Sequence, residues 1–263
     1  MKVEYIGLKS KLIQRGEKIF PIFCNSLLLN EENLMENDII VISSKIVSLE
    51  QNRVLNIETY PLKPQSSLLK NDTELDEHFI SMIISESEVI YGGVKGALLT
   101  MSNGILQANA GIDRSNIAKG LAILLPKNPS DFADEFKEDI KEKFGLRLHI
   151  LIIDSSTRPL RRGTTGLALG FSKNFPAVID ERGSPDLYGN KMQITTRAIA
   201  DNIATGANLV MGESNQSTPF VIVRGLSLDD EWSNKPIISE KIELEQCLYF
   251  KHFTSSPLYK KQD

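Results

Sequence analysis

An Asn-Gly pair at residues 103–104 places the strongest constraint on how this chain can fold. The pair lies between two strand-like runs, residues 97–101 and 105–109, and both residue types tolerate the positive φ angles of a tight hairpin turn. An antiparallel hairpin does not fit a purely parallel, doubly wound sheet, although strand-like and helical patterns alternate along the rest of the chain. We therefore predict an α+β fold with mixed and antiparallel sheets.

Apolar periodicity and turn residues predict the remaining elements. Strands are expected at residues 2–8, 38–43, 121–125, 147–153, 219–225 and around 247–250, before a polar tail that we expect to fray. Helices are expected within residues 16–27, 71–90, 128–145 and 195–212. Asp72 and Thr73, with Asp76 shortly after, are the expected cap of the second helix, and Thr195 and Thr196 that of the fourth.

Charge and cysteine content exclude several classes of protein. The 263 residues carry a formal net charge of −4, which argues against general binding to nucleic acid or anionic membranes, because phosphate-backbone affinity requires a surplus of lysine and arginine. Cys24 and Cys247 lie in apolar surroundings, which favours reduced thiols and leaves one long-range disulfide as the alternative. No apolar run is typical of a signal peptide or approaches the ~20 residues of a membrane span. We expect a cytoplasmic protein.

The segment at residues 154–166 (DSSTRPLRRGTTG) has the composition of an anion-binding loop. It follows an apolar, strand-like run, so Asp154 is expected where that strand gives way to a loop. Arg158, Arg161 and Arg162 supply planar, bidentate donors, and the glycines at 163 and 166 supply flexible backbone amides. The alternative is a loop held to acidic neighbours by surface salt bridges.

Three acidic residues, Asp113, Asp154 and Glu213, fall at the ends of apolar segments. If the fold brings them together they form an oxygen-ligand site, with Ser155 as an additional ligand, and such a site selects Mg²⁺ or Mn²⁺ over zinc. The alternative for Asp113 and its neighbour Asn116 is an ordinary Asx turn. Patterns typical of zinc sites, nucleophilic hydrolases and Walker A loops are missing from the sequence. Carboxylate-bound metal with an arginine cluster therefore favours phosphoryl transfer from a nucleotide.

Four sequence blocks in a fixed order resemble the coenzyme F420-0:L-glutamate ligase (F420 gamma-glutamyl ligase) family. They are residues 108–116 (ANAGIDRSN), 154–166, 182–189 (RGSPDLYG) and 209–213 (LVMGE). Residues 38–48 (DIIVISSKIVS) add a fifth similarity upstream, and the resemblance spans residues 5 to 226. Any one block is weak evidence for the family, but four blocks in the same order are specific to it.

The resemblance implies a GTP-dependent amide ligase that requires a divalent metal, Mg²⁺ or Mn²⁺, with K⁺ as a further cation. In the family, GTP phosphorylates a carboxylate of the acceptor F420-0, and the amine of L-glutamate then attacks the acyl phosphate. Members are two-domain α+β proteins that form intertwined homodimers. We predict one domain from residues 1–90 and 190–263, which carries part of the nucleotide site, and an inserted domain from residues 91–189, which carries the metal and anion loops.

The family motifs also assign roles to individual residues of this chain. They imply that the nucleotide contacts Leu8, Ser44, Lys45, Asn116, Met211 and Gly212. They imply that metal is bound by Asp113, Asp154, Ser155 and Glu213. We assign Arg158, Arg161 and Arg162 by their chemistry to catalysis, where they would hold phosphate or the small anionic acceptor. A lysine in the position of Lys45, considered alone, is more often a solvated surface lysine.

Three positions depart from the family pattern. Lys9 stands where the family has proline after Gly7 and Leu8. Leu49 stands where the family usually has lysine, and Leu160 stands where it commonly has tryptophan. These differences leave two alternatives to an F420-0 ligase. The chain is either a paralogue that ligates an amino acid to a different acceptor, or a nucleotide-binding regulatory protein without turnover.

Overall fold

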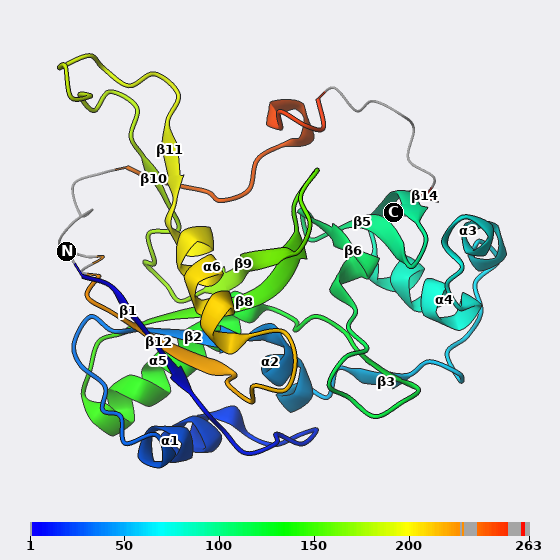
Figure 1. The fold of residues 1–263 in the computed structure, drawn as a ribbon, viewed down its shortest axis with the longest axis horizontal. Coiled ribbons are helices and arrows are strands. Elements are labelled where there is room, and N and C mark those ends of the chain that lie inside the picture. Colours follow the sequence, from blue (N-terminus) through cyan, green and yellow to red (C-terminus); the bar gives the residue numbers. More distant parts are fainter. Residues whose placement is uncertain (1, 227, 229–235, 252–258, 261–263) are drawn as a thin grey trace. The chain divides into compact units, whose positions relative to one another are not determined.

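The computed structural model describes residues 2–226, 228, 236–251 and 259–260, which form two compact units. Unit 1 comprises residues 1–51, 126–158 and 162–240, and unit 2 comprises residues 52–125, 159–161 and 241–263. Figure 1 labels the elements of both units along the ribbon.

This division differs from the predicted domains, 1–90 with 190–263 and 91–189, because of two strand pairings. Strand β8 (His149–Thr157) pairs in parallel with β2 (Ile39–Ser43), which brings residues 126–158 into unit 1. Strand β3 (Val54–Asn56) pairs with β7 (Leu121–Ile123), which brings the segment from residue 52 into unit 2. The chain therefore leaves unit 1 earlier, and returns to it earlier, than the predicted boundaries at residues 90 and 190.

The framework of unit 1 is a mixed five-stranded sheet with the order β1-β12-β2-β8-β9. Its edge strands are β1 (Glu4–Leu8) and β9 (Thr164–Phe171), and β12 (Phe220–Arg224) lies between β1 and β2. The β2·β8 pair is parallel, and the other three pairs are antiparallel. A smaller antiparallel sheet joins β10 (Val178–Asp180) to β11 (Thr196–Ala198) and β13 (Ile237–Ile238). These sheets confirm the predicted α+β class.

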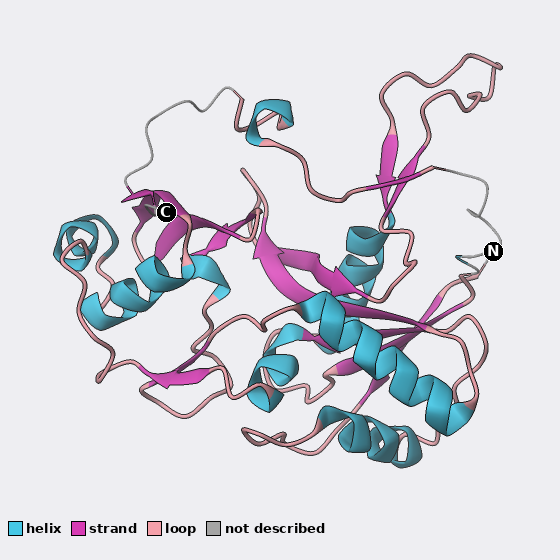
Figure 2. Ribbon diagram, turned by 180° about the vertical axis from the view of Figure 1, so that it is seen from behind, coloured by secondary structure: helices cyan, strands magenta, loops and turns pink. Residues whose placement is uncertain are grey.

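Helices cover both faces of the five-stranded sheet. One face packs on α1 (Ile19–Leu29), α2 (Ser44–Glu50) and α5 (Pro129–Phe144), and the other packs on α6 (Ile199–Met211). Helix α6 crosses the near face in Figure 1, and the long helix α5 lies on the near side in Figure 2, the view from behind. Alternate residues of β2 and β8 enter the two cores, so both strands are apolar at every position from 39 to 42 and from 150 to 153.

Two glycines of β9 allow helices to approach the sheet backbone on opposite faces. A Cβ atom added to Gly166 would lie 2.1 Å from the carbonyl oxygen of Ala204 in α6, and one added to Gly170 would lie 2.6 Å from the amide nitrogen of Ser130 in α5. Between them the register shifts by one residue, since Ile152 opposes Gly170 and Ile153 opposes Ala168. This bulge reverses the alternation of side chains and so turns the two glycines toward different helices. Gly166 therefore serves close packing, where the sequence suggested a flexible loop amide.

A buried ion pair ties the start of β2 to the end of β12. Arg224 donates from Nε to Oδ1 of Asp38 over 2.9 Å and from Nη2 to Oδ2 over 2.7 Å. The Asp38 side chain is 1% exposed, and its Oδ2 also accepts from the amide of Met35 over 2.9 Å. The hydrogen bond to Asp38 raises the pKa of the Arg224 guanidinium.

Unit 2 contains the predicted Asn-Gly hairpin. Its four-stranded sheet has the order β14-β4-β5-β6, with bounds Tyr259–Lys260, Val89–Val94, Ala97–Ser102 and Ile105–Ala108. Asn103 and Gly104 have φ angles of 51° and 71°, so the turn that joins β5 to β6 is confirmed. Helices α3 (Ser66–Thr73) and α4 (Glu77–Glu86) and the 3₁₀ turn η1 (Asn109–Gly111) pack around a core centred on Phe79.

The predicted caps of two helices are wrong. Thr73 is the last residue of α3, and the left-handed φ of 57° at Glu74 ends that helix before α4 begins. Asp76 is the true N-cap of α4, since its carboxylate accepts from the amides of residues 78 and 79 over 2.9 and 3.1 Å. In the fourth helix, Thr196 pairs within β11, so α6 begins only after Ala198. In both places a tertiary pairing or a backbone reversal overrides a plausible local cap.

One strand boundary and one predicted strand also differ from the sequence prediction. Strand β8 does not end at residue 153 but continues through Asp154 to Thr157, because its polar half pairs with β9. Residues 247–250 form turns after the 3₁₀ turn η2 (Leu244–Gln246), where a strand was predicted. The predicted fraying tail falls largely on residues 252–258 and 261–263, outside the described residues.

Both cysteines, Cys24 in unit 1 and Cys247 in unit 2, are free thiols, as favoured from the sequence. Cys24 is buried and Cys247 is half-buried. Among the helices of the described residues, none combines the length and apolar character that crossing a bilayer requires.

The contact between β9 and α6 makes a prediction about stability. We expect Gly166→Ala to lower the free energy of unfolding by about 3 kcal/mol, the upper end of the cost of overpacking, because the new Cβ meets helix backbone that cannot rotate away. Gly163→Ala is the matched control, since its Cβ has open space and only the φ of 91° opposes it, at a cost of about 1 kcal/mol. Urea unfolding followed by far-ultraviolet circular dichroism measures both, and equal losses would contradict this account.

Candidate functional site

One end of the unit 1 sheet gathers most of the residues that the sequence assigned to a site. The register aligns one row across all five strands: Leu8, Phe220, Ile42, Ile152 and Gly170. Immediately beyond this row β2 ends, and the amide of Ser43 donates to the carbonyl of Pro219 over 3.0 Å. Ser43 at the end of β2 pairs with Ile153 of the parallel strand β8. Ser44 and Asp154 are the residues that follow this pair along the two chain segments. The strand register therefore brings a predicted nucleotide position, Ser44, and a predicted metal position, Asp154, to the same end of one sheet.

The N-terminal segment and the end of α6 meet at this end as well. A Cβ on Gly7 would lie 2.7 Å from side-chain atoms of both Val210 and Thr218, and the amide of Ser10 donates to the carbonyl of Ser217 over 3.0 Å. Leu8 is fully buried and Met211 is 8% exposed, so their side chains belong to the core. Of the predicted nucleotide positions here, Gly212 is the more accessible to a ligand.

Ser44 and Lys45 open helix α2 directly after β2. Ser44 is buried and Lys45 is half-buried, which differs from a solvated surface lysine. Leu49 lies one turn after Lys45 on the same helix and packs against the unit 1 core. The leucine at this position therefore has a structural reason.

Strand alternation separates the neighbours Asp154 and Ser155. Along β8, residues 150 and 152 enter the core beneath α1, α2 and α5, and residues 151 and 153 enter the core beneath α6. Continued alternation places Asp154 on the α2 face and Ser155 on the α6 face. Both residues are half-buried, opposite Leu167 and Gly166 of β9. Asp154 therefore shares a face with Ser44 and Lys45, whereas Ser155 shares one with the end of α6.

Glu213 follows α6 and is held by two side chains that the sequence analysis did not single out. Thr164 donates from Oγ1 to Oε1 of Glu213 over 2.7 Å, and Asn208 donates from Nδ2 to the same oxygen over 3.0 Å. Asn208 lies one turn before the end of α6, and Thr164 is the first residue of β9. The only sequence signal was the spacing between Asn208 and Glu213, because the contact with Thr164 spans 49 residues.

The three arginines have different environments. Arg158 is half-buried; its Nε donates to Oγ1 of Thr165 over 2.9 Å, and its Nη2 lies 3.5 Å from the carbonyl oxygen of Gly166. Arg161 groups with unit 2, and Arg162 is an exposed residue of unit 1. Within the described residues none of the three forms an ion pair, so the salt-bridged alternative is not what the structure shows. Leu160, between them, has a φ of 57° and is fully exposed.

Asp113 and Asn116 lie in unit 2, after η1. The backbone of Asp113 pairs with Ile123, and its carboxylate accepts from the amide of Ser115 over 2.6 Å and from the Ser115 hydroxyl over 3.0 Å. The neighbouring Arg114 guanidinium lies 4.1 Å from the centre of the Phe79 ring, which anchors the segment on α4. The Asx-turn alternative thus describes the local geometry, with Asn116 in a left-handed conformation at a φ of 53°.

The predicted metal ligands are divided between the units. Asp154, Ser155 and Glu213 lie in unit 1, whereas Asp113 lies in unit 2. In the described parts of the chain, no three His, Cys, Asp or Glu side chains gather closely enough to hold a metal ion. The donor chemistry fits Mg²⁺ or Mn²⁺, since carboxylate and hydroxyl oxygens are their usual protein ligands. A single site built from all four residues stays a prediction.

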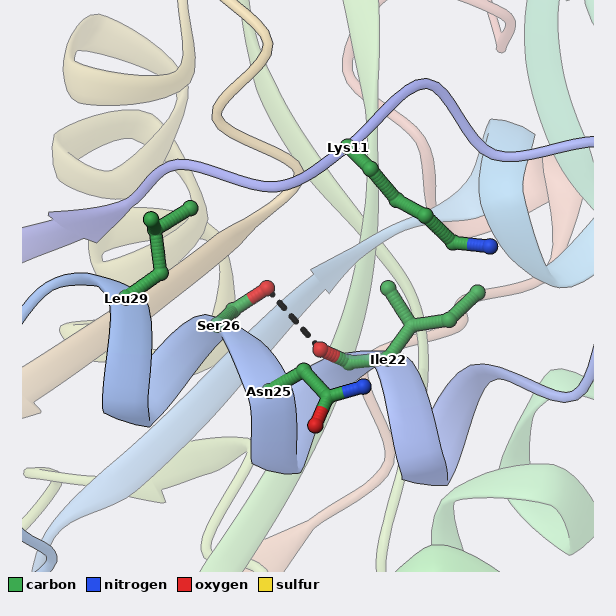
Figure 3. A pocket seen from close by; sticks show the side chains of 5 residues that line it. All are labelled: Lys11, Ile22, Asn25, Ser26 and Leu29. Atoms are coloured by element: carbon green, nitrogen blue, oxygen red, sulfur yellow. Dashed lines mark hydrogen bonds between the residues drawn. The ribbon is translucent and has the colours of Figure 1, made fainter.

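A pocket of about 260 Å³ lies elsewhere on unit 1, against α1 (Figure 3). It is lined by Lys11, Ile22, Asn25, Ser26 and Leu29. The Ser26 hydroxyl donates to the carbonyl of Ile22 over 3.0 Å, and the Lys11 ammonium pairs with Glu17. The pocket includes none of the residues predicted from the sequence, and its one cation already has a carboxylate partner.

Comparison with known proteins assigns the family. The sequence model of the F420-0:gamma-glutamyl ligase family matches residues 7–225. A coenzyme F420:L-glutamate ligase of Methanocaldococcus jannaschii is 35% identical over 228 residues, 86% of this chain and 89% of the relative. A protein of the same name from Methanococcus maripaludis strain C6 is 34% identical over 92% of this chain and 96% of its own length. The match extends from the first strand of the sheet to the last, so the chain belongs to the F420-0:gamma-glutamyl ligase family.

Proposed function

We propose that this protein is a GTP- and divalent-metal-dependent ligase that forms an amide bond between L-glutamate and a carboxylate of an F420-0-like acceptor. Membership of the family supports ligation of glutamate, because the relatives are named for that activity. One structural observation carries the proposal for this chain. Ser44, Lys45, Asp154 and Glu213 all lie at one end of a single sheet, beside Arg158.

Each group has a task that follows from its chemistry. Lys45 and the Gly212 turn of unit 1 would bind the nucleotide. Asp154, Ser155 and Glu213 of the same unit would hold Mg²⁺ or Mn²⁺, which would neutralise phosphate charge, and K⁺ would be a further cation. Arg158 would hold an anionic oxygen of phosphate or acceptor, because Thr165 and Gly166 orient its guanidinium without neutralising its charge.

The proposed reaction needs no nucleophile from the protein. An oxygen of the acceptor carboxylate attacks the γ-phosphorus of GTP, the bond to the β-phosphate oxygen breaks, and GDP leaves. The amine of L-glutamate then attacks the acyl carbon, phosphate leaves with the bonding electrons, and the amine loses a proton to solvent. Both steps depend on orientation and on stabilisation of negative charge, which are the roles assigned to the lysine and arginine side chains. A homodimer is part of the same proposal and rests on the family resemblance.

A second candidate function is ligation of glutamate to a different acceptor. The observation that favours it is Leu160, which is fully exposed in a left-handed conformation among the arginines. An exposed aliphatic side chain offers a different contact from the tryptophan that is common in the family. The regulatory alternative had Leu49 as its marker, and that residue is explained by its contact with the core.

The first prediction concerns substrate dependence. We expect phosphate release from GTP to require Mg²⁺ or Mn²⁺, L-glutamate and F420-0 together, and to rise at least about 100-fold over GTP alone, since both substrates must be positioned for transfer. Malachite-green detection of phosphate, with mass spectrometry of the product, measures this. Turnover only with another carboxylate acceptor would establish the second candidate, and tight GTP binding without turnover would overturn ligation.

The second prediction concerns Asp154. We expect Asp154→Asn to lower kcat/KM by about 100-fold or more, because a neutral amide holds the cation more weakly than a carboxylate does, and the cation neutralises the negative charge of the phosphate oxygens in the transition state. Asp131→Asn, in the exposed first turn of α5, is the matched control and is expected to change kcat/KM less than about 2-fold. Circular dichroism checks that both variants fold. Normal turnover of folded Asp154→Asn would remove this residue from the proposed site.

A further inference from the structure

We propose that Thr164 and Asn208 are positioning residues, which fix the carboxylate of Glu213 by both donating to its Oε1 and so present Oε2 to the bound cation. The inference rests on the proposed role of Glu213 as a metal ligand and adds two residues to that site. The distances are 2.7 Å from Thr164 Oγ1 and 3.0 Å from Asn208 Nδ2. Both hydrogen bonds end on Oε1. Among the described residues, no donor forms a hydrogen bond with Oε2 of Glu213.

Three separate parts of unit 1 meet at this carboxylate. Thr164 starts β9, Asn208 lies in the last turn of α6, and Glu213 follows the C-cap Gly212. Gly212 has a φ of 72° and a ψ of 176°, a conformation that favours glycine and turns the chain away from the helix axis. The amide of Gly212 also donates to the carbonyl of Asn208 over 3.0 Å. The backbone reversal therefore brings Glu213 back beside the helix turn that carries one of its donors.

The spacing between the two donors is fixed by close packing nearby. Gly166, two residues after Thr164, lies against the backbone of Ala204 and Thr205 in α6. The hydroxyl of Thr205 donates to the carbonyl of Gly166 over 3.2 Å. Because β9 and α6 are in contact at this point, the distance between Thr164 on β9 and Asn208 on α6 is fixed. The contact preorganises the carboxylate rather than leaving it to the rotamers of an exposed glutamate.

The donors are neutral, and this matters for cation binding. Asp180 provides a contrast in the same unit, because the Arg182 guanidinium donates to both of its oxygens, at 2.8 and 3.0 Å from Nε. That pairing lowers the pKa of Asp180 to about 2 and offsets its charge. A hydroxyl and an amide orient Glu213 but leave its negative charge to attract a cation. Mg²⁺ and Mn²⁺ bind oxygen ligands in strict geometry, so a fixed carboxylate binds them better than a mobile one.

The test uses Mn²⁺ as the probe and measures its binding to the full chain by the loss of the free-ion electron paramagnetic resonance signal. We expect Thr164→Val and Asn208→Ala each to raise the Kd for Mn²⁺ by about 10-fold, the lower end of the effect of removing a group that orients a ligand. Thr164→Ser keeps the hydroxyl and is expected to restore the Kd to within about 2-fold of the parent.

Two matched controls make the same chemical changes away from Glu213. Thr157→Val alters the residue that pairs directly with Thr164 across the hairpin, and Asn202→Ala alters an exposed asparagine of α6. Both controls are expected to bind Mn²⁺ like the parent. Glu213→Gln serves as the reference for complete loss of this ligand, and circular dichroism monitors folding of every variant.

The outcomes separate this inference from the proposed function. If Glu213→Gln weakens Mn²⁺ binding while Thr164→Val and Asn208→Ala do not, the positioning role is overturned and the metal role of Glu213 stands. If Glu213→Gln leaves Mn²⁺ binding unchanged, its metal role fails and this inference fails with it. Equal weakening by Thr164→Val and Thr164→Ser would also overturn the inference, because a hydroxyl is still present in the serine variant.

Discussion

The parallel pairing of β2 with β8 is the interaction on which the arrangement of unit 1 depends. Both strands are buried on both faces, so a shift of one residue would move every aliphatic side chain into the wrong core. The register is therefore tightly specified, and with it the alignment of Ser43 with Ile153. Parallel strands end on the same side of a sheet, and a lysine-bearing helix start and an aspartate consequently lie next to each other there. The position of the site follows from packing of the core.

The β8–β9 hairpin extends this framework into the chemistry of the site. Its bulge directs Gly166 toward α6 and Gly170 toward α5, so the hairpin is clamped between helices on both faces. The same strand supplies Thr164 to Glu213 and Thr165 to Arg158. Tight packing and polar recognition are thus adjacent on β9, and a change that separates it from α6 would disturb both a carboxylate and a guanidinium.

Arg158 and Glu213 are both held by neutral groups, which contrasts with two other arginines of unit 1. Arg182 and Arg224 pair with carboxylates, whereas Arg158 is oriented by a hydroxyl and a carbonyl. Glu213 is likewise held by a hydroxyl and an amide. An ion pair orients a side chain and also offsets its charge. A side chain that binds a charged ligand has to be oriented by neutral groups, so that its own charge is still available to the ligand. This difference supports the proposal that these two residues bind charged ligands.

The sequence by itself determined the α+β class, the hairpin at Asn103-Gly104, the helix that ends at Gly145 and the family, because these depend on local turn chemistry, periodicity or contiguous motifs. It also singled out Asp154, Glu213 and Arg158. Only the tertiary structure decided that β8 runs on through Asp154, that Asp154 and Ser155 face opposite sides, and that Thr164 and Asn208 hold Glu213. Strand pairing and hydrogen bonds between residues distant in the chain set these features, and no local pattern encodes a partner 49 residues away.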